Sequence, residues 1–412
     1  MMTNFDSVGI VGLGKLGLPL ATVIAKAGFD VLGVDNSSSL IQKLNSKNFG
    51  DFTEPKLQEY LETSCTRMIF SGSMPILQKT QLVYLILPTP SKEDGKFNSS
   101  VIEKACEDLV QIWKDSRLEH TIVIVSTVNP GDTQRINLNL QKRLIEFNTK
   151  VELLYSPEFI ALGSVIKNLE CPDTILIGCD NNSSPGMLRH LNIMNAITET
   201  KSVPTKVMSF QEAELAKILV NCFVTMKISF ANFVGQLSYA FPEHVSADKI
   251  LDAVGEDSRI GKLYLRSGLG FAGPCFPRDN RALTAVSRDF GLDAKLSKAV
   301  DSINSSIPVE TVKRLASQFT HGSLGIVGVA YKKDTTVIEE SQTLEIAHLW
   351  SEEIGEVLWW DPLVQELPEN SQSLTKVESV ANLQSCDIII CAFDFKDFLP
   401  DDLLNSGKCF VL

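Results

Sequence analysis

The chain has 412 residues, 44% of them hydrophobic, and a formal net charge of −12 at pH 7. A chain of this length buries ample core and is too long for one typical domain, so we expect two or three domains. The acidic balance, without any block of Lys and Arg, disfavours a nucleic-acid partner.

Nine cysteines show no paired spacing, and there are only five histidines. This usage argues against a disulfide framework and against a zinc site, and it indicates a cytoplasmic protein without a bound metal. The N-terminus reaches its first apolar strand at Val8 without the basic region of a signal peptide. No apolar run reaches the length of a membrane span, so we expect no membrane partner.

Residues 8–35 read as strand, glycine-rich turn, helix and strand, and Gly12, Gly14 and Gly17 form a G-x-G-x-x-G motif. The first glycine permits a tight turn, the second lets the backbone approach a pyrophosphate, and the third lets helix and strand pack. Asp35 ends the second strand, where a carboxylate accepts from the ribose hydroxyls of NAD and disfavours NADP. The alternative is a glycine-rich turn without a ligand.

Further strands alternate with helices, which predicts a parallel, doubly wound sheet. The expected strands lie at 8–11, 30–35, 82–87, 121–125, 151–154 and 174–177. Three segments follow strand ends, at 88–90, 126–128 and 156–158. Because ligands bind beyond the carboxyl ends of such strands, we expect these segments to contribute to one ligand site.

Residues 209–240 predict one long helix, roughly 45 Å in length at about 1.5 Å per residue. On it, Lys217 and Asn221 are four residues apart and share a face. A solvent-facing lysine with an incidental asparagine is the alternative, but their neighbours are mostly apolar, so we expect this part to be buried. Other apolar side chains spread too widely round the helix for one core face, which predicts a homodimer. They are Phe223, Met226, Ile228, Phe230, Phe233 and Leu237.

After a shorter helix at 246–254, residues 270–279 place Cys275 among glycines and prolines, four positions before Asp279. The glycines let a ligand approach the backbone, and the prolines stiffen the segment that carries the sulfur. Cys275 is therefore either a buried structural cysteine or a nucleophile.

Residues 281–317 predict helices broken near Gly291 and Pro308, and a second strand–helix series follows from 323 to 392. The expected fold is α/β, with two Rossmann-like doubly wound domains joined by a long central helix. We expect an NAD-binding domain at 1–200, a helical dimerisation domain at 201–305 and a second Rossmann-like domain at 306–412, for which the resemblance described next implies nucleotide-sugar binding.

The chain resembles the UDP-glucose/GDP-mannose dehydrogenase family from about Ser7 to the region of Asp394. Shared motifs occur in the family's order: the glycine motif, the three strand-end segments, the helix of Lys217 and Asn221, and segments 257–261, 270–279 and 327–334. The resemblance implies a four-electron oxidation of the C6 alcohol of a nucleotide sugar, most simply UDP-glucose, with NAD as cofactor.

The same resemblance implies a role for each motif residue. Cys275 would attack the intermediate aldehyde, and Lys217 and Asn221 would stabilise the C6 oxygen. Asp279 and Thr127 would position a water or relay a proton, and Glu158 would be the base that hydrolyses the thioester. The implied cofactor-binding residues are Gly12, Gly14, Lys15, Leu16, Gly17, Asp35, Pro88, Thr89, Ser126, Thr127 and Arg278. The implied substrate-binding residues are Glu158, Phe159, Ile160, Lys217, Asn221, Arg259, Tyr264, Gly270, Phe271, Tyr331 and Lys332.

Four positions depart from the family pattern. Leu162 replaces a second glutamate, Pro274 replaces the serine before the nucleophile, Arg278 replaces a lysine, and Glu339 replaces an arginine that contacts the cofactor. Three alternatives therefore stay open: a nucleotide-sugar-binding paralogue with impaired catalysis, a different sugar nucleotide such as GDP-mannose or a UDP-N-acetylhexosamine, and a two-electron hydroxyacid dehydrogenase. NADH formed per sugar separates the first and last of these from the main hypothesis.

Overall fold

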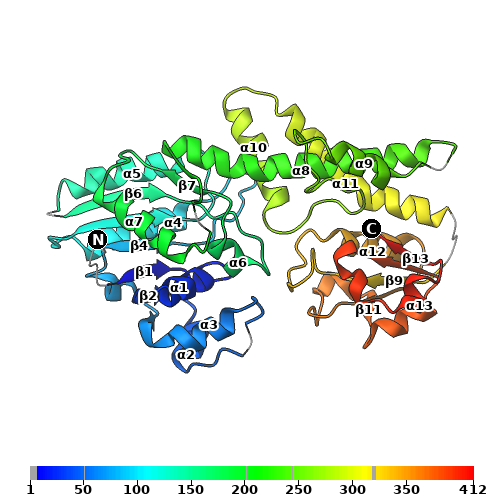
Figure 1. Ribbon diagram of the computed structural model, residues 1–412, viewed down its shortest axis with the longest axis horizontal. Helices are drawn as coiled ribbons and strands as arrows, with labels where there is room; N and C mark the ends of the chain where they lie inside the picture. The colour runs from blue at the N-terminus through cyan, green and yellow to red at the C-terminus, as the bar shows by residue number, and fades with distance from the viewer. Residues whose placement is uncertain (1–6, 51, 148, 201, 244, 318–321) are drawn as a thin grey trace. The chain divides into compact units, whose positions relative to one another are not determined.

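The computed structural model describes residues 7–50, 52–147, 149–200, 202–243, 245–317 and 322–412. By its internal contacts the chain divides into two compact units, Met1–Ile218 and Leu219–Leu412. Each unit contains its own sheet, so residues after 320 do not join the sheet of residues 8–36 (Figure 1). The α/β fold class with two Rossmann-like sheets is confirmed, and the predicted three-part division of the chain stays a prediction.

The first unit is built on an eight-stranded sheet in the order β3-β2-β1-β4-β5-β6-β7-β8. Its strands are β1 Val8–Val11, β2 Val31–Val34, β3 Met68–Ser71, β4 Leu82–Leu85, β5 Glu119–Ile124, β6 Lys150–Tyr155, β7 Ile175–Gly178 and β8 Thr205–Met208. The strands from β3 to β6 are parallel, as expected, but β7 meets β6 antiparallel through Tyr155 and Gly178, and β8 runs parallel to β7. The parallel pattern therefore does not extend over the predicted strand at 174–177.

Helices cover both faces of this sheet. They are α1 Gly17–Lys26, α2 Ser38–Asn45, α3 Leu57–Ser64, α4 Ser100–Ile112, α5 Asp132–Leu144, α6 Val165–Glu170 and α7 Pro185–Ile197, with short 3₁₀ turns at Cys65–Arg67 and Met74–Leu77. Alternate strand residues enter different cores: Leu82 and Tyr84 pack with α1 and α7, whereas Val83 and Leu85 pack with α4. This alternation is why the strands read as continuous apolar runs in the sequence.

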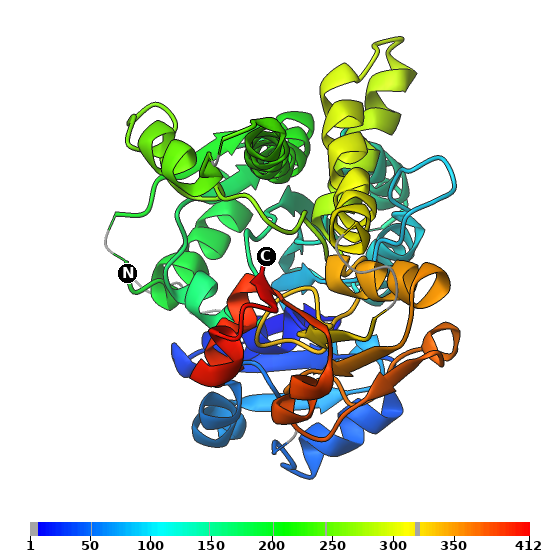
Figure 2. The ribbon, with the colours of Figure 1, turned by 90° about the vertical axis from the view of Figure 1, so that its right-hand side faces the viewer.

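The long helix α8, Phe210–Ala240, is unbroken as predicted, and Figure 2 shows it end-on. Its first residues belong to the first unit, and those from Leu219 onward belong to the second. By length and composition alone, α8 could cross a membrane, although 39% of its apolar stretch is buried. The sequence-based expectation that no segment reaches this length was wrong, because the mean hydropathy of the stretch stays high although Lys227, Thr225 and Ser229 interrupt it.

The second unit contains a five-stranded parallel sheet in the order β11-β10-β9-β12-β13. Its strands are β9 Leu324–Val327, β10 Val357–Trp360, β11 Leu374–Lys376, β12 Ile388–Cys391 and β13 Cys409–Val411. Its helices after α8 are α9 Ala247–Gly255, α10 Phe276–Asp289, α11 Lys295–Ala316, α12 Gln342–Glu353 and α13 Asp401–Leu404, with 3₁₀ turns at Glu369–Ser371, Val380–Ser385 and Phe393–Phe398.

Two boundaries in this unit differ from expectation. Helix α10 begins at Phe276 rather than near residue 281, because Pro277 in its first turn suits a helix start. The break near Gly291, where φ is +68°, is confirmed, but Pro308 lies inside α11 and does not end it. The buried side chains of Ile307 and Val312 on either side of the proline keep this helix packed.

Candidate active site

The glycine-rich turn has the geometry that a dinucleotide requires. A Cβ added to Gly12, where φ is +93°, would lie 2.1 Å from the carbonyl oxygen of Ile86, and one added to Gly17 would lie 1.8 Å from that of Gly12. Both positions therefore exclude any side chain. At Gly14, by contrast, a Cβ would meet nothing within 4 Å, so the backbone there faces open space that a pyrophosphate can occupy. The flanking Lys15 is exposed, and Leu16 packs against the core.

Asp35 follows β2 and is fixed by two backbone amides. Its Oδ2 accepts from Leu13 N at 2.8 Å, and its Oδ1 accepts from Ser37 N at 2.8 Å. The first bond ties the carboxylate to the glycine-rich turn, as a ribose acceptor requires. The residues present thus fit a bound NAD.

The segments after β4 and β5 are bonded to each other at the carboxyl end of the sheet. Ser126 Oγ accepts from Leu87 N at 2.9 Å and donates to Leu87 O at 2.7 Å. Thr89 Oγ1 donates to Thr127 O at 2.8 Å. Pro88 beside them is exposed. Three of the expected residues, Thr89, Ser126 and Thr127, are therefore brought together.

The segment after β6 meets the first turns of α8. Lys217 is 8% exposed, its Nζ donates to Glu158 O at 2.9 Å, and it lies over the Phe159 ring at 4.6 Å. Burial raises the pKa of the Glu158 carboxyl to about 7, and the nearby Lys217 charge opposes that rise. Lys217 is therefore not a surface lysine, and Glu158 can exchange a proton near neutral pH.

Apolar packing explains two neighbours of Glu158. Ile160 and Leu162 are partly buried and pack against the hydrophobic core to which α1 and α7 contribute. The leucine that replaces the family's second glutamate is thus a packing residue.

Behind Glu158 lies a buried chain of hydrogen bonds that the sequence did not indicate. Tyr84 Oη lies 3.0 Å from His190 Nδ1, His190 Nε2 lies 2.9 Å from Ser156 Oγ, and Ser156 Oγ donates to Leu176 O at 3.0 Å. Because the Ser156 hydroxyl donates to the Leu176 carbonyl, it must accept from His190 Nε2–H. His190 Nδ1 then carries no proton and accepts from the Tyr84 hydroxyl. Burial lowers the pKa of His190 to about 4, which agrees with this neutral tautomer.

In the second unit, Cys275 is exposed and is the residue immediately before α10. Asp279, in the first turn of that helix, is buried, and its Oδ2 accepts from Asn221 Nδ2 at 2.6 Å. The exposed sulfur contradicts the reading of Cys275 as a buried structural cysteine. A thiol at a helix N-terminus, beside a bonded amide and carboxylate, is suited to nucleophilic chemistry. Arg278 in the same turn is partly buried.

The segment before Cys275 is fixed from two sides. Asn304 accepts from Phe271 N at 2.7 Å and donates to Phe271 O at 2.9 Å, and a Cβ at the adjacent Gly270 would lie 2.2 Å from Asn304 Oδ1. Gly273, where φ is +82°, donates to Glu339 O at 2.9 Å. The exposed Glu339 thus supports this segment through its backbone.

Tyr331 packs against this glycine. A Cβ at Gly273 would lie 2.6 Å from the Tyr331 ring. Burial raises the pKa of the Tyr331 hydroxyl to about 12, and the charge of Cys275 adds to that rise. Lys332 follows it and is partly buried.

Two expected substrate residues lie on an exposed loop. The Arg259 guanidinium is exposed and donates to both oxygens of Asp257, at 2.9 and 2.6 Å. Tyr264 is 53% exposed and meets the Phe276 ring edge-on at 6.5 Å. The structure therefore leaves Arg259 turned to its own loop.

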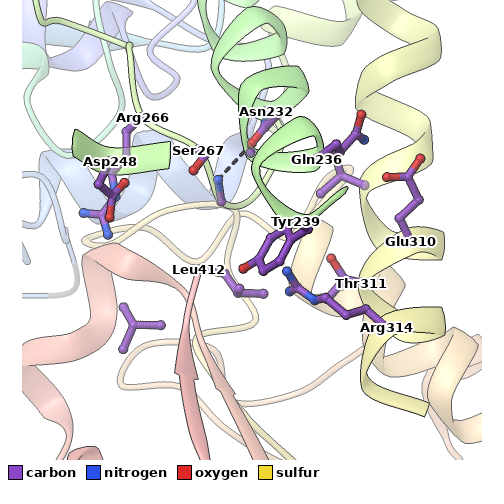
Figure 3. Close-up of a pocket in the computed structure, with 14 residues that line it drawn as sticks. Asn232, Gln236, Tyr239, Asp248, Arg266, Ser267, Glu310, Thr311, Arg314 and Leu412 are labelled. Atoms are coloured by element: carbon purple, nitrogen blue, oxygen red, sulfur yellow. Dashed lines mark hydrogen bonds between the residues drawn. The ribbon is translucent and has the colours of Figure 1, made fainter. Parts of the chain in front are cut away.

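A cavity of about 380 Å³ in the second unit includes residues at the carboxyl end of β13, Val411 and Leu412 (Figure 3). Two guanidinium groups line it: Arg314 lies 4.3 Å over the Tyr239 ring, and Arg266 lies 3.3 Å over the Phe393 ring. Sequence reasoning missed these two arginines, because nothing in the local sequence sets them apart from surface arginines.

Comparison with known proteins covers the whole chain. The NAD binding, central and UDP binding domains of the UDP-glucose/GDP-mannose dehydrogenase family match residues 6–195, 211–306 and 325–407. A UDP-glucose 6-dehydrogenase of Haloferax volcanii is 27% identical, covering 96% of this chain and 93% of the relative. One of Rickettsia felis is 29% identical, covering 95% and 87%.

Solved structures agree. The structure of a UDP-glucose dehydrogenase from the archaeon Pyrobaculum islandicum matches with a TM-score of 0.87 at 28% identity, covering 100% of this chain and 97% of that one. In the sequence comparison, a GDP-mannose 6-dehydrogenase of Pseudomonas syringae is also similar, 27% identical over 83% of this chain and 77% of its own length. With NAD binding, central and UDP binding domains in sequence, the chain belongs to the UDP-glucose/GDP-mannose dehydrogenase family of oxidoreductases.

Proposed function

We propose that this chain oxidises the C6 alcohol of UDP-glucose to a carboxylate, in two hydride transfers to NAD. The observation that carries the proposal is the exposed Cys275 immediately before α10, with Asp279, bonded to Asn221, in the first turn of the same helix. A carboxylate cannot form by hydride loss from an aldehyde until a nucleophile has added to it. A two-electron hydroxyacid dehydrogenase would have no use for this thiol.

Electron and atom balance fixes the sequence of steps. The alcohol first loses a hydride and a proton to give the aldehyde. The sulfur of Cys275 then bonds to the aldehyde carbon, and loss of the second hydride from that carbon gives a thioester. Water cleaves the carbon–sulfur bond, releases the carboxylate and returns the thiol. Each hydride reduces one NAD⁺, so one sugar yields two NADH.

The residues of the site match these demands. Lys217 and Asn221 are one helical turn apart on α8 and supply a cation and an amide for the developing charge on the C6 oxygen. Glu158, with its pKa raised to about 7, is ionised often enough near neutrality to accept a proton from water and is protonated often enough to return one. We assign the nucleotide end of the substrate to the cavity that Arg266 and Arg314 line together with Asp248 and Glu310, because its guanidinium groups can bind phosphate.

Counting NADH per sugar tests the proposal, with UDP-glucose, GDP-mannose and two UDP-N-acetylhexosamines as candidates. We expect two NADH per UDP-glucose. One NADH per sugar would indicate a two-electron enzyme or an arrested one, and no NADH with any sugar would favour a nucleotide-sugar-binding protein. Conversion of another sugar nucleotide alone would move the proposal to that substrate.

Cys275→Ala tests the thioester. The first hydride transfer needs no sulfur, so a small amount of NADH and bound aldehyde is expected, whereas carboxylate output falls by about three orders of magnitude or more. Two NADH per sugar at a near-native rate would show that the aldehyde is oxidised as its hydrate.

The proposal includes a homodimer in the cytoplasm, formed through α8. All the side chains named for this interface except Ile228 recur, together with Leu219, along one stripe of the helix at alternating intervals of four and three residues: Leu219, Phe223, Met226, Phe230, Phe233 and Leu237. Four of the predicted interface residues, Phe223, Phe230, Phe233 and Leu237, are between 48% and 60% exposed. This spacing is typical of helix–helix seams. Phe230→Asp should convert a dimer to a monomer in sedimentation; a monomeric wild-type protein at all concentrations would contradict the dimer.

A further inference from the structure

Glu214 is a fully buried carboxylate whose contacts the proposed mechanism does not use. It lies on α8 and is 0% exposed. Its Oε2 accepts from Gly131 N at 2.6 Å, and its Oε1 accepts from Thr133 N at 2.7 Å. These amides open the 13-residue helix α5, whose preceding residue Gly131 has no side chain to cap it. Glu214 therefore caps α5 from a distant part of the chain.

The segment that Glu214 fixes is the one that carries Thr127. Its beginning is bonded to the segment after β4, through the Ser126 and Thr89 hydroxyls. Its middle is bonded at Asn129, which accepts from Phe97 N at 2.9 Å and donates to Phe97 O at 2.8 Å. Its last residues are bonded to α8 through Glu214.

The same turn of α8 fixes a second strand-end segment. Lys217 lies three residues after Glu214, and its Nζ donates to the carbonyl of Glu158 at 2.9 Å. Glu214 thus binds the segment after β5, and Lys217 binds the segment after β6. Since residues three apart are neighbours on a helix, one rigid turn sets the distance between Thr127 and the group of Lys217 and Glu158.

A carboxylate is a costly choice for a purely structural contact. Burial raises the pKa of Glu214 to about 7, and the charge of Asp132 adds to that rise. Apolar side chains would join α5 to α8 without this cost. Two amides that must be held in fixed directions, however, require an acceptor with two oxygens.

We propose that Glu214 is a positioning residue for the oxidation, which holds the Thr127 segment in register with Lys217 and Glu158 so that alcohol, cofactor and base are aligned. This inference rests on the proposed function. The atoms that Glu214 bonds, Gly131 N and Thr133 N, are not among the groups expected to bind the nucleotide sugar. Loss of Glu214 should therefore slow turnover more than it weakens binding.

The test compares Glu214→Gln with the matched control Glu212→Gln. Glutamine keeps the shape of Glu214 but places an amide group against one of the two backbone N–H groups, so one bond is lost. Glu212 lies on the same helix turn, is exposed and caps it through Ser209 N at 2.9 Å. Both variants are assayed for kcat and for KM of NAD and of the nucleotide sugar, and for amide hydrogen exchange of peptides that cover residues 126–133.

We expect Glu214→Gln to lower kcat by about tenfold or more, because small misplacements of a catalytic group have such effects. KM of the nucleotide sugar should change less than twofold, and exchange at residues 126–133 should accelerate. Glu212→Gln should stay within twofold of wild type throughout. A Glu214→Gln enzyme with kcat within twofold of wild type would overturn the inference, as would a loss confined to KM.

A second variant and the turnover of the wild-type protein distinguish a folding defect and a failure of the proposed function from a failure of the positioning role. If the Gln variant does not fold, Glu214→Asp keeps the charge but is one carbon too short to reach both amides, and the same fall in kcat is expected; normal kcat in that variant overturns the inference. A wild-type protein that forms no NADH refutes the proposed function, whereas normal wild-type turnover with an unaffected Glu214→Gln variant refutes only the positioning role.

Discussion

Replacing Glu158 with glutamine should stabilise the first unit while it impairs the reaction. Burial raises the pKa of this carboxyl from 4.5 to about 7, so ionising it in the folded protein costs free energy. Glutamine has nearly the same shape and carries no charge at any pH. The variant is therefore relieved of the cost of burying a carboxylate and loses the proposed base for thioester hydrolysis.

The sign and size follow from proton linkage. Between pH 4.5 and about 7 the folded protein binds a proton at Glu158 that the unfolded chain has lost, so wild-type stability falls as pH rises through this window. Above about pH 7, the free energy of unfolding of the wild type is lowered by the whole effect of the pKa difference between the folded and unfolded states. At about 1.4 kcal/mol per pKa unit, the destabilisation of the wild type is roughly 3 kcal/mol. Because the Glu158 side chain is only partly buried, solvent reduces this value, and we expect a gain of ~1–2 kcal/mol for the glutamine variant.

Scanning calorimetry at pH 8 and pH 4.5 measures the effect. A gain of about 1–2 kcal/mol in a unit of this size corresponds to a rise in Tm of roughly 3–6 °C at pH 8, most of which should disappear at pH 4.5. Glu93→Gln, at an exposed position, removes the same charge and should shift Tm at neither pH. A Glu158→Gln variant that melts below wild type at pH 8 would refute the reasoning, because the carboxylate would then be stabilising.

Two other changes test the glycine-rich turn of the first unit and the Cys275 segment of the second. Asp35→Arg removes the acceptor fixed by Leu13 N and Ser37 N, so KM for NAD should rise by about tenfold or more, while NADP gains an attractive charge; unchanged kinetics with both cofactors would show that Asp35 does not face the ribose. Gly273→Ala places a methyl group against the Tyr331 ring at a residue with φ of +82°, so the thiol should react several-fold more slowly with substrate and with iodoacetamide alike. Native reactivity in both assays would show that the segment tolerates the strain.

Local signals made the dinucleotide half predictable. Glycines at fixed spacing, an apolar strand on each side and an acid at the second strand end are all read within residues 8–35, and parallel topology then brings the later strand ends together. The predicted long helix and the buried Lys217 follow from equally local patterns, whereas the pattern around Cys275 left a buried cysteine and a nucleophile open. Elements and burial in short segments are therefore accessible from the amino-acid sequence alone, whereas the roles of single residues stay predictions.

Partners distant in sequence were not accessible. Glu214 reads as one acid in an acidic helix start, and its amides lie 81 and 83 residues earlier in the chain. The reversed direction of β7 leaves no trace in its composition. Pro308 carries a strong local signal for a helix end, yet packing on both sides of it overrides that signal.

The buried chain from Tyr84 through His190 to Ser156 has a consequence for how the chain finds its fold. Each group in it donates one hydrogen bond to the next: Tyr84 to His190, His190 to Ser156, and Ser156 to the carbonyl of Leu176. If β4 paired one residue out of register, Tyr84 would turn to the other face of the sheet, and the buried His190 Nδ1 on α7 would lose its hydrogen-bond partner. These hydrogen bonds thus raise the free energy of misassembled sheets by more than they lower the free energy of the native one. They widen the energy gap between the native fold and its competitors.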